Sequence, residues 1–202
     1  MLDRGAVGFA RRAVLGAGLV LLVACETTPP SATFAEITFA HLPPIVLDVA
    51  GIEYVEQFVA PLEPPHAEDR FPIAPAVAAR RWVQDRLVAG GGAGTARVVL
   101  TDASGTREAL ATQGGVTGFF TDEQAERYGV SIVMRLEIVA EGSRYVEGHV
   151  EASARQSTTV AEDATLEERD RALYRLTETV MQGFNKEFET GIRSHLGRFV
   201  LQ

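Results

Sequence analysis

Residues 130–157 decide the fold, and they read VSIVMRLEIVA, EGS and RYVEGHVEASARQS in order. Two long runs with the composition of strands flank a short Glu-Gly-Ser segment, which is the pattern of a β-hairpin. In the second run Val146, Gly148, Val150 and Ala152 alternate with polar residues. Because successive side chains of a strand point to opposite faces, this alternation predicts a sheet that is packed on one face and solvated on the other.

A long amphipathic helix is predicted after the hairpin. Thr165 and Glu168 have the spacing of a capping box, which satisfies backbone amides at the start of a helix. Apolar residues then recur every three to four positions: Leu166, Leu173, Leu176, Val180, Phe184, Phe188, Ile192, Leu196 and Phe199. A stripe with this period covers an apolar surface, so we expect the helix to lie on the packed face of the sheet.

The sequence before the hairpin predicts further strands and two shorter helices. Strands are expected at 45–49, 52–59, 97–102 and 107–112, one helix at 75–87 that the glycines at 90–92 end, and one that starts at 121–124 and stops by 129. Trp82 is expected in the core, where a large aromatic side chain anchors its helix. The expected fold class is α+β, an antiparallel sheet with a long C-terminal helix and a second helix packed on one face.

The N-terminal 25 residues have the pattern of an export signal. Arg11 and Arg12 precede a run of twelve apolar residues at 13–24, and Cys25 follows as the single cysteine of the chain. Twelve residues span about 18 Å as a helix, which is too short to cross the roughly 30 Å of membrane hydrocarbon. A positive end followed by a short apolar run is typical of a signal peptide.

The end of this run, Leu22-Val23-Ala24-Cys25, resembles a bacterial lipobox. The resemblance implies that residues 1–24 are removed, that Cys25 is linked to diacylglycerol, and that its new amino terminus is acylated with a fatty acid such as palmitate. The chain would then be anchored in the cell envelope facing the periplasm. The paired arginines leave the export route open between the general and the twin-arginine pathway, and the membrane, inner or outer, also stays open.

The rest of the chain divides into a tether and one domain. Residues 25–43 include Thr27-Thr28-Pro29-Pro30 and predict a flexible tether, and 44–202 have the length of a single α+β domain. The net charge is −8, and the leader carries three arginines and one aspartate, so the mature chain carries −10. Such a charge repels phosphate backbones, so nucleic acid is not an expected partner.

Few residues suggest chemistry, and we predict no enzyme activity, catalytic residue, metal or cofactor. The four histidines (His41, His66, His149 and His195) lack metal-ligand spacing, and the glycines at 90–94 lack the lysine of a phosphate loop. A hydrolase that uses Ser104 or His149 is the only catalytic alternative, and no nucleophile motif surrounds Ser104. Glu147, His149 and Glu151 share the solvated face of their strand, and we expect them to form a partner surface.

In the order of its elements the chain resembles the auxiliary lipoproteins of ABC-type intermembrane transport systems. The resemblance is carried by the lipobox, the early Leu42-Pro43, the helix with Arg81-Trp82, the strand that ends at Thr101-Asp102, the hairpin and the closing helix. It implies a noncatalytic accessory subunit of an envelope complex that moves lipid between membranes. The alternative is a lipoprotein that binds a lipid or another apolar ligand between its long helix and the sheet.

Overall fold

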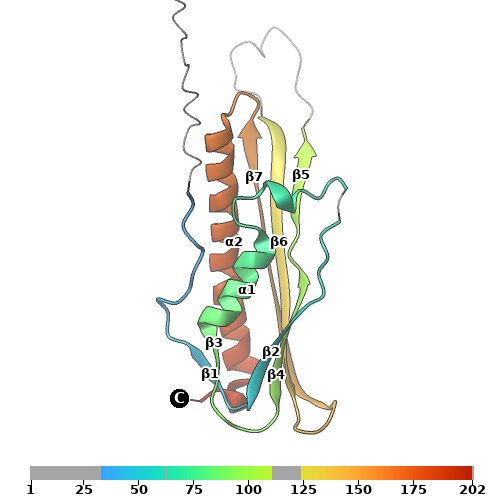
Figure 1. Cartoon of the computed structure of the whole chain (residues 1–202), viewed down its shortest axis with the longest axis vertical. Helices are drawn as coiled ribbons and strands as arrows, with labels where there is room; N and C mark the ends of the chain where they lie inside the picture. Colours follow the sequence, from blue (N-terminus) through green and yellow to red (C-terminus); the bar gives the residue numbers. More distant parts are fainter. Residues whose placement is uncertain (1–32, 62, 111–123, 202) are drawn as a thin grey trace, which may run out of the picture. The chain divides into compact units, whose positions relative to one another are not determined.

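The computed structural model describes residues 33–61, 63–110 and 124–201 (Figure 1). These residues form an α+β domain, as the sequence predicts. The signal peptide, Cys25 and the start of the helix expected at 121–129 lie outside the described residues. The elements are β1 (Ile45–Leu47), β2 (Gly51–Glu56), η1 (Glu68–Arg70), α1 (Pro75–Arg86), β3 (Leu87–Ala89), β4 (Thr95–Asp102), β5 (Gly105–Ala109), β6 (Gln124–Val139), β7 (Val146–Ala161), α2 (Leu166–His195) and η3 (Gly197–Phe199).

The predicted hairpin is confirmed as β6 and β7 of a five-stranded sheet, in which β6 is central and β7 pairs only with β6 among the described strands. On its other edge β6 pairs antiparallel with β4 and β5, and β2 pairs with β4. The β2–β4 pair is parallel, so the sheet is mixed rather than antiparallel throughout. The connection between them contains α1 and returns the chain to the end where β2 began, which makes the pair parallel.

Residue 124 begins a strand, so the short helix expected at 121–129 is wrong over its described part. Residues 126–130 pair with β5 on one edge and with β7 on the other. This double pairing satisfies the backbone groups of the segment, and tertiary pairing therefore overrides the local signal for a helix start.

A second, two-stranded sheet joins β1 to β3 in parallel. Helix α1 ends at Arg86, and the chain passes directly into β3 before the glycine turn, so the glycines do not cap the helix as expected. The C-terminal residues add to this sheet, because Leu201 N donates to Val46 O at 2.8 Å.

Both helices pack on the same face of the large sheet (Figure 1). The capping box of Thr165 and Glu168 is confirmed at the start of α2. Trp82 of α1 is fully buried, with its ring 5.2 Å from that of Phe188 on α2. The buried stripe of α2 begins at Leu173, whereas Leu166 is 69% exposed.

Residues 33–43, which we call the strap, lie against the two helices. Ile37 and Phe39 are only 6% and 5% exposed, and the Phe34 ring stacks on Tyr174 of α2 at 5.1 Å. The burial of these apolar side chains makes the strap part of the domain. The tether expected at 25–43 is therefore too long, and the domain begins before residue 44.

Within the described part of the chain, no helix combines the length and the apolar character needed to span a membrane.

Candidate functional site

The candidate site is the face of the large sheet opposite the helices. It is built by the alternation that the hairpin sequence predicts: buried residues of β7 such as Val150 and Ala152 point to the helices, and the residues between them point to solvent. The elements of the described part that pack on the sheet lie on its other face. Two areas of the solvated face differ in chemistry.

The first area, which we call the charged patch, lies toward the hairpin turn and consists of Arg97, Arg135, Glu137, Glu147, His149 and Glu151. Arg97 Nε donates to Glu137 Oε2 at 3.0 Å, and Arg135 Nε lies 3.0 Å from Glu137 Oε1. The register places Glu137 between Arg97 of β4 and His149 of β7. Opposite charges therefore face each other between β4 and β6, at Arg97 and Glu137, and between β6 and β7, at Arg135 and Glu151.

The three residues expected as a partner surface are all exposed on β7. Glu147, His149 and Glu151 occupy alternate positions, so their side chains share one face. Partner binding at these residues stays a prediction. In the described ranges, histidines and acidic residues form no group of three or more that could hold a metal ion.

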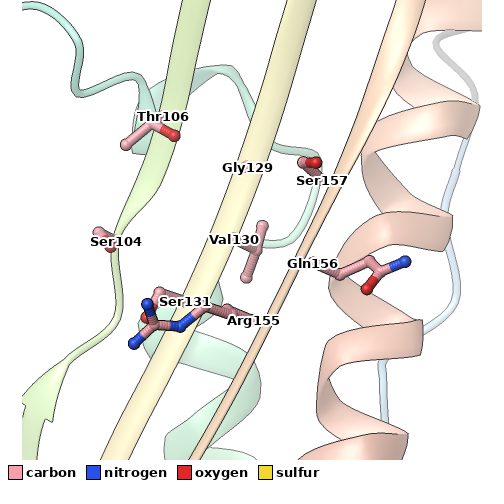
Figure 2. A pocket seen from close by; sticks show the side chains of 8 residues that line it. All are labelled: Ser104, Thr106, Gly129, Val130, Ser131, Arg155, Gln156 and Ser157. Atoms are coloured by element: carbon pink, nitrogen blue, oxygen red, sulfur yellow. The ribbon is translucent and has the colours of Figure 1, made fainter.

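The second area lies further along the hairpin and is an open hollow of about 450 Å³ (Figure 2). We call it the hydroxyl hollow and define it by Ser104, Thr106, Gly129, Ser131, Arg155 and Ser157, with Val130 and Gln156 also lining it. The register pairs Ser131 with Arg155, and Gly129 with both Thr106 and Ser157. Residues from three strands are thereby brought together.

Two features shape the hollow. A Cβ at Gly129 would lie 2.8 Å from Thr106 Oγ1, so the glycine leaves room for the Thr106 side chain. Figure 2 shows the Arg155 side chain reaching from β7 across β6 toward Ser131. Four hydroxyl groups and one guanidinium therefore converge on one open space. Hydroxyls donate and accept hydrogen bonds, and a guanidinium only donates.

Sequence reasoning identified Ser104 alone among these residues, as a turn serine. Between β4 and β5, Ser104 N donates to Asp102 Oδ1 at 3.0 Å, so this local hydrogen bond uses the Asp102 carboxylate and not the Ser104 hydroxyl. The other members follow a signal present in the sequence: small polar residues at alternate positions of β5, β6 and β7. That signal becomes a site only when the register between the strands is known.

The structure does not bring the two hydrolase candidates together. Ser104 lies beside Ser131, because Ser131 N donates to Ser104 O, whereas His149 pairs with Glu137. Six residues of β6 separate Ser131 from Glu137, which is about 20 Å at ~3.4 Å per residue. A direct hydrogen bond between the Ser104 hydroxyl and the His149 ring is therefore impossible in this structure.

Side chains fill the space between α2 and the sheet. Leu173, Met181, Phe184, Phe188 and Ile192 of α2 are fully buried there. The carboxyl end of the helix also approaches β7 closely, since a Cβ at Gly148 would lie 2.8 Å from Leu196 Cδ2. A ligand bound between helix and sheet would have to displace this core.

Polar groups of α1 hold the strap in place. The Asp85 carboxylate accepts hydrogen bonds from Thr38 Oγ1 at 2.6 Å and from Phe39 N at 2.8 Å. Burial raises the pKa of Asp85, but these hydrogen bonds and the charge of Arg81 outweigh it, so the pKa lies below its ordinary value. The carboxylate therefore stays ionised and bound to the strap at neutral pH.

No family model and no curated protein matches the sequence. Among solved structures, a minor lipoprotein from Acinetobacter baumannii aligns with a TM-score of 0.36 and 10% identity, over 77% of this chain and 98% of that one. The rare lipoprotein B from Shewanella oneidensis aligns with a TM-score of 0.35 and 11% identity, over 69% and 92%. A protein from Xanthomonas campestris aligns with a TM-score of 0.28 and 9% identity, over 78% and 95%. Similarity this distant carries no functional argument.

Proposed function

We propose that the chain is a lipid-anchored, noncatalytic accessory protein of the cell envelope. Cys25 would hold it at a bilayer on the periplasmic side, and the charged patch would contact a subunit of an ABC-type intermembrane lipid transport system. The lipobox and the element order support this assignment. The observation that carries it is the length of chain between the expected anchor and the strap.

Only residues 26–33 separate Cys25 from Phe34, whose ring stacks on Tyr174. A fully extended chain spans at most ~3.6 Å per residue, so this connection reaches about 30 Å. Because the strap is packed into the domain, it adds no reach. An anchored domain would therefore stay within a few tens of ångströms of its membrane, where a membrane-embedded partner is accessible.

The exposed surface supports binding to a partner protein rather than the carrying of a bound lipid. Side chains fill the space between α2 and the sheet, which disfavours a lipid carrier that binds its cargo there. The charged patch presents Glu147 and Glu151 on β7, and among the described strands β7 pairs only with β6. A basic partner surface would complement these carboxylates, and the unpaired edge of β7 can accept a further strand.

Site-specific crosslinking in intact cells tests the proposal. A photoreactive amino acid at His149 is expected to give an adduct with a subunit of an envelope transport complex. The same amino acid at Glu187, which is exposed on α2, is the matched control and is expected to give no such adduct. If neither position captures a transport component, the proposed function is wrong. Mass spectrometry of the purified chain tests the anchor separately, because acylation adds hydrocarbon mass at Cys25.

A further inference from the structure

We propose that the hydroxyl hollow binds the phosphate group of a membrane lipid headgroup. That the phosphate belongs to a membrane lipid, and is not a free anion, rests on the proposed anchor at Cys25. The inference assigns a ligand class to an area distinct from the charged patch.

The lining residues fit a tetrahedral oxyanion. Guanidinium and hydroxyl groups are donors to phosphate oxygens, and the Arg155 guanidinium lines the hollow together with the hydroxyls of Ser104, Thr106, Ser131 and Ser157. The lining contains no carboxylate that would bind a cation and no aromatic ring on which a sugar could stack. The volume of about 450 Å³ accommodates a phosphate with its neighbouring glycerol.

Arg155 is available for a ligand. Arg97 and Arg135 on the same face of the sheet are committed to the carboxylate of Glu137. Among the described residues, Arg155 has neither a salt bridge nor a side-chain hydrogen bond, and its side chain is exposed. The nearby Asp102 carboxylate accepts from Ser104 N, which partly satisfies that charge.

The hollow lies at the end of the domain where the strap begins. A Cβ at Gly191 of α2 would lie 2.8 Å from Val150 of β7, which fixes the two elements side by side. On β7, Ser157 lies about 24 Å beyond Val150 at ~3.4 Å per residue. On α2, a distance of about 24 Å corresponds to about 16 residues at ~1.5 Å per residue, which leads from Gly191 back to a position near Tyr174. Tyr174 stacks on Phe34, the residue that the short connection leads to.

This position brings the hollow toward the bilayer. The connection of about 30 Å restrains the strap end, and the carboxylates of Glu147 and Glu151 lie toward the opposite end of the hairpin. The anchored domain would therefore turn its hollow, rather than its charged patch, to the lipid surface.

A titration of the purified chain in an uncharged sugar detergent tests the proposal. The probes are a short-chain phosphatidylglycerol, the diacylglycerol with the same acyl chains, and inorganic phosphate, with binding followed by the amide NMR shifts of Gly129 and Ser131. We expect the phosphatidylglycerol to bind, the diacylglycerol to leave the shifts unchanged, and inorganic phosphate to bind at least tenfold more weakly.

Two variants locate the site. Arg155→Gln is expected to lower the affinity for phosphatidylglycerol at least tenfold, and Ser157→Val, which keeps the preference for a strand but fills the hollow, is expected to do the same. Arg144→Gln in the exposed hairpin turn is the matched control and is expected to keep wild-type affinity.

Each remaining outcome overturns the proposal. Absence of binding, equal binding of phosphatidylglycerol and diacylglycerol, or wild-type affinity of Arg155→Gln would show that the hollow does not recognise the phosphate. Inorganic phosphate binding as tightly as the lipid would show a site for a free anion. These results are independent of the anchor, since a chain without acyl mass at Cys25 would refute the proposed function and leave the titration unaffected.

Discussion

The guanidinium of Arg86 is 1% exposed and donates to Glu189 Oε2 at 2.5 Å, which joins α1 to α2. The same guanidinium donates to the carbonyl of Pro43 at the end of the strap and, through Nε, to Asn185 Oδ1 at 3.2 Å. One buried side chain therefore links three segments that lie far apart in the sequence.

Replacing this arginine is expected to destabilise the domain strongly. Arg86→Ala removes the buried ion pair and the donor to the Pro43 carbonyl, whereas Asn185 Oδ1 keeps its hydrogen bond from Trp82 Nε1 at 2.8 Å. Breaking a buried pair on one side costs about 3 to 5 kcal/mol, so we expect a loss of about 3 kcal/mol in the free energy of unfolding. Urea denaturation followed by the fluorescence of Trp82, the single tryptophan, measures it.

The control uses the second arginine on the same carboxylate. Arg193 Nε donates to Glu189 Oε1 at 3.0 Å, but its side chain is 51% exposed. Exposed pairs contribute little, so Arg193→Ala is expected to cost less than about 0.5 kcal/mol. Equal losses in the two variants would show that burial does not decide the contribution of Arg86.

Local patterns predicted much of the fold, because they act within a few residues. The capping box of Thr165 and Glu168, the helix that starts at Pro75 and the alternation along β7 are each encoded in one short segment. The parallel pairs of β1 with β3 and of β2 with β4 depend on partners about 40 residues away. No local signal specifies such a pairing, so the expectation of an antiparallel sheet is wrong for these two pairs of strands.

The strap and the hollow were missed for related reasons. The prolines at 29 and 30 favoured a tether, although Ile37-Thr38-Phe39 already alternates apolar and polar residues as a packed segment does. The hollow needs the register of β5, β6 and β7, because Gly129 meets Thr106 and Ser157 only across strands. The exposed positions of Glu147, His149 and Glu151 could be predicted from the sequence, because a single strand carries all three.

Acid is expected to release the strap. The pKa of Asp85 in the folded chain lies below its ordinary value of 3.8, so the carboxylate contributes stability that is fully present above that value. This contribution is lost as the pH falls through the lower pKa of the folded state, where the carboxyl is protonated. Hydrogen exchange of the Phe39 amide, which donates to Asp85, should therefore lose protection below about pH 4 before the core amides do.

The variant Asp85→Asn tests whether protonation of Asp85 causes this loss of protection. It removes the titrating group but keeps an oxygen acceptor, so the protection of the Phe39 amide should be lower at neutral pH and should no longer depend on acid. If the wild-type acid dependence persisted in this variant, another group would have to control the strap.

Two glycines of α2 should respond in opposite ways to alanine. A Cβ at Gly183 meets nothing within 4 Å, so Gly183→Ala is expected to stabilise the domain by about 0.5 to 1 kcal/mol through helix propensity. A Cβ at Gly191 would lie 2.8 Å from Val150 Cγ2, and overpacking costs typically about 1 to 3 kcal/mol. Gly191→Ala is therefore expected to give no stabilisation or a loss in urea denaturation. A gain as large as that of Gly183→Ala would show that α2 can move away from β7 without cost.

The length of the connection between Cys25 and the strap should control access to the partner. We expect an insertion of 40 glycine and serine residues after Ser31 to leave the folded domain intact, because the strap begins only after this point. Lengthening the connection from eight to 48 residues lowers the effective concentration of the domain at the membrane by roughly 15-fold, following the −3/2 power of the length.

The crosslinking yield from His149 should fall by about tenfold as a result. The same 40 residues added after Gln202 are the matched control, because they change the mass and composition equally and leave the reach from Cys25 unchanged. An unchanged yield in the first insertion would mean that the partner is bound without help from the anchor. A fall in both insertions would mean that the added sequence itself, rather than the longer reach, disturbs the contact.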